Sequence, residues 1–269
     1  MTIRLLGLPQ DNNSSFLTGP AAGPAAIRRA LISDSANSFN EAGLDVSAPS
    51  VMQDEGDVAL AGLSGQAAFD AIYDAVARQV KTGDAVLSLG GDHSVSFPAI
   101  KAHADHYPGL NILHFDAHPD LYDDMQNNPF SHASPFARLM ETGQIARLVQ
   151  IGIRTLNDHQ RAQADHFGAE IHHMRDLSAV SAIRFDGPVY LTVDMDVLDP
   201  AFAPGVSHYE PGGLGTRALL GMIQTIQADV VGADLVELNP DRDPAGITEM
   251  VAAKILKEMI GLLHYEQGA

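Results

Sequence analysis

Acidic residues and histidines gather at four points of the chain, each directly after a short apolar run. The four segments are GGDHS (90–94), DAHPD (116–120), DMDVLDP (194–200) and VELNP (236–240). The densest stretch, HFDAHPDLYDD (114–124), holds four carboxylates and two histidines within eleven residues. Like charges packed this closely repel one another, so we expect a bound cation to offset the repulsion.

The spacing within these segments lets neighbouring side chains face one point. Residues i and i+2 at a strand end point the same way, so Asp116 can act with His118, and Asp194 with Asp196. One such pair alone is usually a helix cap or a turn, but three clusters in equivalent positions agree with one another. One small cation needs fewer ligands than this chain offers, whereas two cations about 3.5–4 Å apart would use them all and activate a water. The six candidate ligands are His93, Asp116, His118, Asp120, Asp194 and Asp196.

The ligand types restrict the metal. Oxygen and imidazole ligands suit Mn²⁺, although intrinsic affinity favours later first-row metals, so supply decides which ion is bound. The chain has no Cys, which excludes thiolate ligands, disulfides and a Cys nucleophile. It has no GxGxxG or Walker pattern to support a nucleotide site.

Two further residues are candidates for chemistry beyond metal binding. His132 in FSHASPF precedes a predicted helix, where an imidazole could relay protons or could equally be a cap or surface residue. Glu237 lies in the apolar stretch GADLVELNP, where an ionised carboxylate is costly unless it is paired. Its partner is either an internal Arg or a cationic substrate, and the surplus of negative charge favours the substrate.

The elements that must position these residues alternate along the chain. Short aliphatic runs without clean alternation predict strands covered on both faces, at 3–8, 84–91, 110–116, 146–154, 188–194 and 230–238. Helical periodicity predicts helices at 65–83, 134–143, 219–228 and 251–265, the second with Ser134 as N-cap and Pro135 in its first turn. This order predicts an α/β fold, a mostly parallel sheet with helices on both faces. Since no linker or repeat interrupts it, we expect residues 1–269 to form a single domain.

Composition restricts the partners. The formal charge of −18 makes nucleic acid an unfavourable partner and cationic ligands a favourable one. The apolar run within MTIRLLGLPQDNN is too short for a signal peptide, and no run approaches the roughly 18 apolar residues of a membrane span. We therefore expect a cytoplasmic protein with no membrane partner.

These motifs together closely resemble the ureohydrolases, the arginase and agmatinase family. The resemblance is carried by GGDHS, FDAHPD, SHASPFARL, DMDVLDPAFAPG, EPGGL and LVELNP, and runs from about residue 85 to the C-terminus, with a weaker match before it. It implies a three-layer α/β/α fold, a binuclear Mn²⁺ centre with two ions per subunit, and hydrolysis of a guanidino group to urea and an amine. It also implies a homo-oligomer, a homotrimer or homohexamer.

The resemblance also implies roles for single residues. One metal would take His93, Asp116, Asp120 and Asp194, and the other Asp116, His118, Asp194 and Asp196, so that Asp116 and Asp194 bridge. His132 would match the proton-relay histidine, and Glu237 the glutamate that holds the guanidinium. Asp120 would also orient the nucleophile, which makes His132, Glu237 and Asp120 the expected catalytic residues.

The substrate is less closely defined by the motifs. SHASPFARLMETG and AFAPGVSHYEPGG look most like plant-type arginases, which favours L-arginine; agmatine, 4-guanidinobutyrate and other small guanidino compounds are the alternatives. Tyr122 stands where animal arginases have a carboxylate-binding Asn, and His208 replaces a Thr common to arginases and agmatinases. The expected contacts of the substrate, besides His132 and Glu237, are Asn127, Asn128, Ser131 and His208. Whether Tyr122, Asp123 and Asp124 face the substrate or solvent is open.

Two other classes compete with a ureohydrolase. One is a binuclear hydrolase of another bond, such as an amide or a phosphoester. A phosphoester site usually has Lys or Arg near the metals, and only Arg138 and Arg154 lie near these clusters in the sequence. A metal-binding relative without turnover would need neither His132 nor Glu237. Both residues are present, which favours the enzyme.

Overall fold

A parallel sheet forms the centre of the molecule. The computed structural model describes residues 2–177 and 182–265, and within them eight strands pair in the order β2-β1-β3-β8-β7-β4-β5-β6, every pair parallel. The strands are β1 (Ile3–Leu8), β2 (Met52–Asp57), β3 (Ala85–Gly90), β4 (Leu110–Phe115), β5 (Ile145–Ile153), β6 (Glu170–His173), β7 (Val189–Asp194) and β8 (Val230–Val236).

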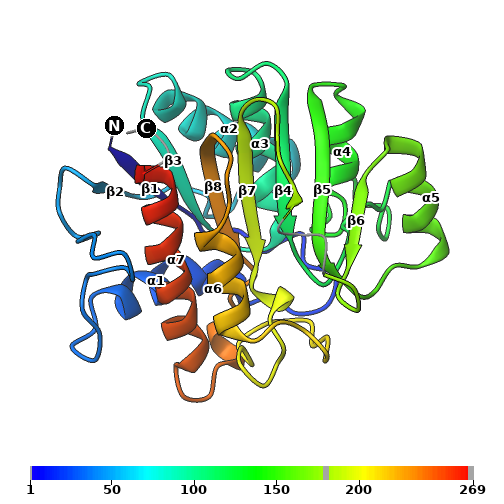
Figure 1. The fold of residues 1–269 in the computed structure, drawn as a ribbon. Coiled ribbons are helices and arrows are strands. Elements are labelled where there is room, and N and C mark those ends of the chain that lie inside the picture. Colours follow the sequence, from blue (N-terminus) through cyan, green and yellow to red (C-terminus); the bar gives the residue numbers. More distant parts are fainter. Residues whose placement is uncertain (1, 178–181, 266–269) are drawn as a thin grey trace.

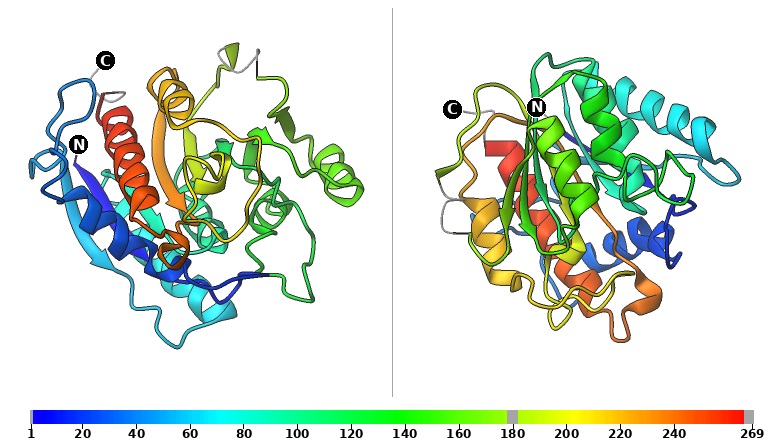
Figure 2. Two further views of the ribbon diagram at one scale, coloured as in Figure 1. Left: turned by 90° about the horizontal axis from the view of Figure 1, so that it is seen from below. Right: turned by 90° about the vertical axis from the view of Figure 1, so that its right-hand side faces the viewer.

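Helices cover both faces of this sheet, which makes three layers (Figure 1). Helix α7 packs against α1 and α6 on one face, and α3 joins α2 to α4 on the other. Ala164 of α5 shares a core cluster with Phe136 of α4, so α5 lies on the second face. The views of Figure 2 show the same two layers. The helices are α1 (Gly23–Leu31), α2 (Gly65–Val80), α3 (Ser96–Ala104), α4 (Pro135–Glu141), α5 (Asp158–Phe167), α6 (Thr216–Gln224) and α7 (Ile247–Tyr265).

The six predicted strands are confirmed, and the structure adds the two edge strands. β2 reads MQDEGD and is largely exposed, and β6 reads EIHH and is half-buried throughout. An edge strand pairs on one side only and tolerates polar side chains, so neither strand carries the apolar run by which the central strands were predicted.

The predicted helices correspond to α2, α4, α6 and α7, and α1, α3 and α5 were missed. α5 is polar, but it has clear end signals: the side chain of Asn157 accepts from the N–H of Gln160, and Gly168 ends the helix in the left-handed conformation. Pro135 does occupy the first turn of α4. Ser134 occupies the N-cap position as predicted, but its side chain makes no cap hydrogen bond.

The strand order places the predicted motifs side by side. The first three strands, β1 to β3, form one side of the sheet, and β4, β5 and β6 form the other side. The last two strands, β7 and β8, then pair between β4 and β3. The neighbouring strands β3, β8, β7 and β4 therefore end together at the carboxyl edge, beside a reversal of strand order, which is where open α/β sheets bind ligands. In the described part of the chain, no helix is long and apolar enough to cross a membrane.

Candidate metal centre and substrate cavity

The four polar segments meet at the carboxyl edge of the sheet. His93 begins a short 3₁₀ helix, His93–Val95, after β3, while Asp116 directly follows β4. Asp194 ends β7 and caps the 3₁₀ helix Met195–Val197, with its side chain accepting from the N–H of Asp196. Glu237 directly follows β8. The structure thus brings all six predicted ligands and Glu237 to one place.

His93 forms one half of the ligand cluster. Its Nδ1 lies 3.1 Å from Oδ2 of Asp116, 3.1 Å from Oδ2 of Asp120 and 3.2 Å from Oδ2 of Asp194. The ring is 1% exposed, and its Nδ1 has no hydrogen-bond partner of acceptable geometry among the described residues. A buried nitrogen that faces three carboxylate oxygens in this way fits a cation between them.

His118 forms the other half. Its Nδ1 lies 2.9 Å from Oδ2 of Asp196 and 3.4 Å from Oδ1 of Asp116. Asp116 therefore turns one oxygen toward each histidine, as a bridging carboxylate would. Asp194 turns its Oδ2 toward His93, whereas its Oδ1 accepts from the N–H of Asp196.

The charges of the cluster are balanced by protons when no metal is bound. Burial lowers the pKa of His93, but the close carboxylates of Asp116, Asp120 and Asp194 outweigh it and leave the pKa well above its ordinary value. Burial, together with the charges of Asp196 and Asp116, raises the pKa of Asp194. A metal ion must displace such protons, so metal binding and proton release are coupled.

His114 is a neighbour of the cluster that the sequence analysis did not single out. Its Nε2 lies 2.8 Å from Oδ2 of Asp116, and Nε2 of Gln150 donates to its Nδ1 at 2.9 Å. His93, His114 and Asp116 could form a three-ligand group by distance. However, the donor from Gln150 places the hydrogen of a neutral His114 on Nε2, and burial lowers the pKa of His114. We therefore assign His114 as a donor that orients Asp116.

A second chain of hydrogen bonds lies beneath His93. Its Nε2 lies 3.1 Å from Oγ1 of Thr192, and that hydroxyl donates to Oδ1 of Asp234. Tyr190 donates its hydroxyl to the other oxygen of Asp234 at 3.0 Å. All four side chains are buried. Because the Thr192 hydroxyl donates to Asp234, it accepts from Nε2 of His93. This series of hydrogen bonds makes Nε2 a donor and directs Nδ1 toward the carboxylates.

His132 and Glu237 form a buried pair beside the cluster. Nδ1 of His132 lies 2.8 Å from Oε1 of Glu237, and the backbone N–H of His93 donates to the same oxygen at 3.0 Å. Burial lowers the pKa of His132, but the Glu237 carboxylate outweighs it and raises the pKa to about 9. Glu237 has a φ of 65°, a left-handed conformation that side chains rarely adopt outside functional sites. The internal partner of Glu237 is thus a histidine, and the alternative of an internal Arg is wrong.

A cavity of about 190 Å³ opens over these groups. The predicted site residues that line it are His118, Asp120, His132, Asp194, Asp196, His208 and Glu237. His208 lies between His118 and His132, with ring centroids 5.8 and 5.3 Å away. Tyr122 also lines the cavity, with Ser15, Met125, Ala133, Thr155 and Gln160.

The other predicted substrate contacts lie outside the lining. Asn127 is exposed, the side chain of Asn128 bonds to Asn13 at 3.1 Å, and the buried Oγ of Ser131 accepts from the N–H of Ala133. Asp123 and Asp124 are exposed. No contact with a substrate follows from these positions, and those roles stay predictions.

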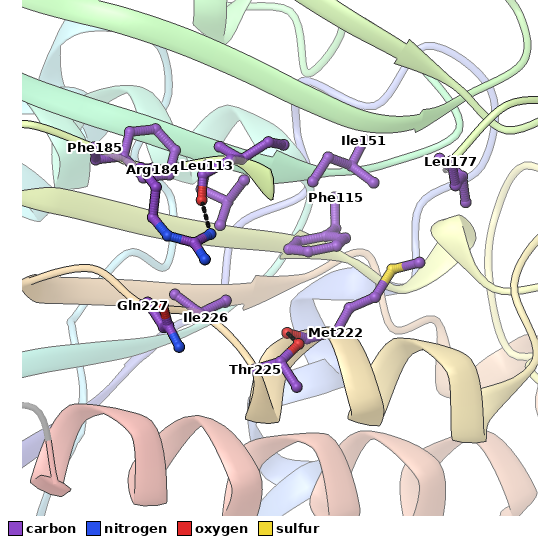
Figure 3. A pocket seen from close by; sticks show the side chains of 11 residues that line it. Leu113, Phe115, Ile151, Leu177, Arg184, Phe185, Met222, Thr225, Ile226 and Gln227 are labelled. Atoms are coloured by element: carbon purple, nitrogen blue, oxygen red, sulfur yellow. Dashed lines mark hydrogen bonds between the residues drawn. The ribbon is translucent and has the colours of Figure 1, made fainter. Parts of the chain in front are cut away.

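A second cavity, of about 150 Å³, lies against the sheet face that carries Leu113, Phe115 and Ile151 (Figure 3). Met222 and Ile226 line its opposite side, near the end of α6. It shares no lining residue with the cavity over the acidic cluster. Arg184 is the one charged residue of its described lining, so it offers no acid, base or metal ligand set.

Comparison with known proteins agrees with this geometry. The sequence model that defines the arginase family matches residues 1–261 of this chain. The chain belongs to the arginase family. Arginase 1, mitochondrial, of Arabidopsis thaliana is 45% identical over 271 residues, which cover 95% of this chain and 79% of that protein. An agmatinase of Bacillus anthracis is 35% identical over 270 residues, 95% of this chain and 90% of that protein.

The solved structures give the same result. The arginase from Medicago truncatula matches with a TM-score of 0.91 and 43% sequence identity, over 97% of this chain and 87% of that one. The resemblance to ureohydrolases, the enzyme class and the three-layer α/β/α fold are thereby confirmed. This arginase family member is an amidinohydrolase of the ureohydrolase class.

One expectation is overturned by the comparison. We expected a cytoplasmic protein, but relatives at 45% identity carry the word mitochondrial in their names, which points away from the cytoplasm. The expectation of a cytoplasmic location is therefore wrong. Its physical basis was weak, because targeting segments are removed from mature proteins and the folded part keeps no record of them.

Proposed function

We propose that this ureohydrolase is an arginase, which hydrolyses L-arginine to L-ornithine and urea. One observation carries the proposal: the buried carboxylate of Glu237 lines the same cavity as four of the six candidate ligands, His118, Asp120, Asp194 and Asp196. Relatives at 45% identity over most of the chain are named arginases, whereas the agmatinase relative is 35% identical. The arginase names of these relatives support L-arginine as the substrate.

The cofactor we propose is Mn²⁺, two ions per subunit. His93, Asp120, His118 and Asp196 would hold the two ions, with Asp116 and Asp194 shared. The fit rests on the oxygen and imidazole ligands and on the separate His93 and His118 halves of the cluster. When bound, such a pair supplies Lewis-acid activation of a water and the positive charge that offsets the carboxylates.

Glu237 would hold the guanidinium. Its two described hydrogen bonds both end on Oε1, one from His132 and one from the backbone of His93, which leaves Oε2 to accept from a substrate N–H. Burial raises the pKa of Glu237, but the charge of His132 outweighs it and keeps the pKa below its ordinary value. An ionised, oriented carboxylate would pair with the positive charge of the guanidinium group and hold its carbon over the cluster.

His132 would move the proton that the leaving amine needs. It lines the cavity and is held by Glu237, so its ring can exchange a proton with a group bound there. Oδ2 of Asp120 lies 3.1 Å from Nδ1 of His93, and Asp120 also lines the cavity. Its carboxylate can accept a hydrogen bond there from the attacking water.

Agmatine is the second candidate, for one reason. No Lys or Arg is among the described residues that line the cavity, so the carboxylate of arginine would depend on uncharged donors such as Tyr122, Thr155 and Gln160. Burial also lowers the pKa of His208, which favours its neutral form. A decarboxylated substrate would not need this recognition.

The test is urea release by the purified, Mn²⁺-loaded protein from L-arginine, agmatine and 4-guanidinobutyrate. We expect the highest kcat/KM with L-arginine. A higher value with agmatine would replace arginase by agmatinase, and no urea from any of the three would contradict the whole proposal. Metal analysis of the same sample should give two Mn²⁺ per chain.

Two further proposals concern the domain organisation and the assembly. We propose that residues 1–269 form one domain. We also propose that the chain assembles as a homotrimer or homohexamer. Light scattering coupled to size-exclusion chromatography measures the mass of the assembly against the 28.6 kDa chain.

A further inference from the structure

The loop that follows β1 brings Ser15 into the lining of the cavity and against His132. The backbone N–H of Ser15 lies 3.1 Å from Nε2 of His132, and its Oγ lies 2.9 Å from the same nitrogen. Ser15 lines the cavity together with His132 and Glu237. The two residues are 117 positions apart in the sequence, so no local pattern pairs them.

These contacts select one tautomer of a neutral His132. A backbone N–H can only donate, so it requires a lone pair on Nε2. The ring hydrogen must then lie on Nδ1, from which it donates to Oε1 of Glu237 at 2.8 Å. The same tautomer satisfies both neighbours, and the opposite tautomer would place two donors face to face at Ser15 and two acceptors face to face at Glu237.

The residues before Ser15 are fixed by hydrogen bonds to two parts of the chain. Oδ2 of the buried Asp92 accepts from the N–H of Asn13 at 3.1 Å and from Oγ of Ser14 at 3.2 Å. The N–H of His132 donates to the carbonyl of Asn13 at 3.1 Å, and Nδ2 of Asn128 donates to Oδ1 of Asn13. Ser15 is therefore held against His132 by its neighbours in the chain.

The hydroxyl of Ser15 adds what the backbone cannot. When Nε2 carries a proton, the backbone N–H faces another donor, whereas Oγ can turn and accept from Nε2–H. The hydroxyl can donate to the neutral ring and accept from the protonated one. Among the side chains that the structure describes, that of Ser15 is the one hydrogen-bonded to Nε2 of His132.

We propose that Ser15 is a positioning residue for the reaction, which holds His132 in the Nδ1–H tautomer and accepts from Nε2 when that nitrogen is protonated. The kinetic part of this role rests on the proposed function. Ser15 acts through His132 and through no bond of its own to the reacting atoms.

The kinetic test compares three variants of the Mn²⁺-loaded protein. Ser15→Ala keeps the backbone donor and removes the hydroxyl, and we expect kcat to fall about tenfold or more with KM within about threefold. Ser15→Thr restores the hydroxyl, and kcat should return to within about threefold of the original protein. Ser50→Ala removes a hydroxyl from an exposed position before β2 and should retain the original kcat.

The second test reads the tautomer directly. The ¹⁵N resonances of the His132 ring, assigned by comparison with His132→Asn and recorded at about pH 10, above the pKa of about 9, should identify a neutral ring with its hydrogen on Nδ1. A hydrogen on Nε2 in the neutral ring would overturn the proposal, as would equal kcat values for Ser15→Ala and Ser50→Ala at equal metal content. If the original protein released no urea, the proposed function and the kinetic role would both fail, and the ring resonances would still decide whether Ser15 sets the tautomer.

Discussion

Nε2 of His114 lies 2.8 Å from Oδ2 of Asp116. The oxygen that receives this hydrogen bond is the one that faces Nδ1 of His93 at 3.1 Å. Two positions separate His114 from Asp116, so both project from the same face at the end of β4. The strand itself thereby supplies a metal-binding carboxylate and the donor that orients it.

Replacing His114 should weaken metal binding. His114→Leu removes the donor but keeps a buried side chain of similar size, so Asp116 loses its orientation, and we expect an affinity about 10–100-fold lower. Titration of the metal-free protein with Mn²⁺, followed by calorimetry, measures the change. His166→Leu, at an exposed position of α5, is the control and should bind like the original. Equal affinities of the two variants would contradict the assigned role.

Replacing Glu237 should stop turnover and leave the metals in place. Glu237→Gln keeps the shape of the side chain and removes the charge that we propose holds the guanidinium, so we expect kcat/KM to fall about 100-fold or more. Urea release and metal content are measured on the same preparation. Glu141→Gln, on the exposed side of α4, serves as the control. Loss of metal from Glu237→Gln would mean that Glu237 is part of the metal site.

The central strands and the clustering of the six ligands could be predicted, because each ligand lies at the end of a buried strand or within five residues after it, and spacings of two residues are local. β2 and β6 could not, since edge strands carry no apolar pattern. His114 was within reach of the same spacing rule, but it lies inside the run LNILHFD and was taken as part of a strand. The contacts of Ser15 with His132 and of Asp92 with Asn13 join residues 117 and 79 positions apart, which a sequence pattern does not encode.

Metal removal should lower stability, by an amount that depends on pH. Burial raises the pKa of Asp196 to about 6 and keeps that of Asp194 high, so the metal-free cluster retains protons that Mn²⁺ must displace. Affinity for Mn²⁺ should therefore be higher at pH 8 than at pH 6. A ligand at 100 times its Kd stabilises by about 2.7 kcal/mol. Thermal unfolding with Mn²⁺ and with a chelator measures the gain, and an equal gain at both pH values would contradict the coupling.

The buried ring of His103 in α3 should make the protein sensitive to acid. Its Nδ1 donates to the carbonyl of Ala99 at 2.8 Å, and its Nε2 lies so close to Gly232 that a Cβ there would be 2.2 Å away. Among the described residues, that Nε2 has no hydrogen-bond partner. Burial lowers the pKa of His103 to about 4, below the roughly 6.5 of an unfolded chain.

The sign of this effect follows from proton binding. Between pH 6.5 and 4 the unfolded chain binds the proton and the folded one does not, so the free energy of unfolding falls as the pH falls through this window, by up to about 3 kcal/mol. His103→Leu removes the titration, so its free energy of unfolding should fall less than that of the original protein from pH 7 to pH 5. Urea unfolding of the metal-free proteins at both pH values measures the two slopes, with His166→Leu as the exposed control. Parallel pH curves for His103→Leu and the original protein would show that protonation of His103 does not drive acid unfolding.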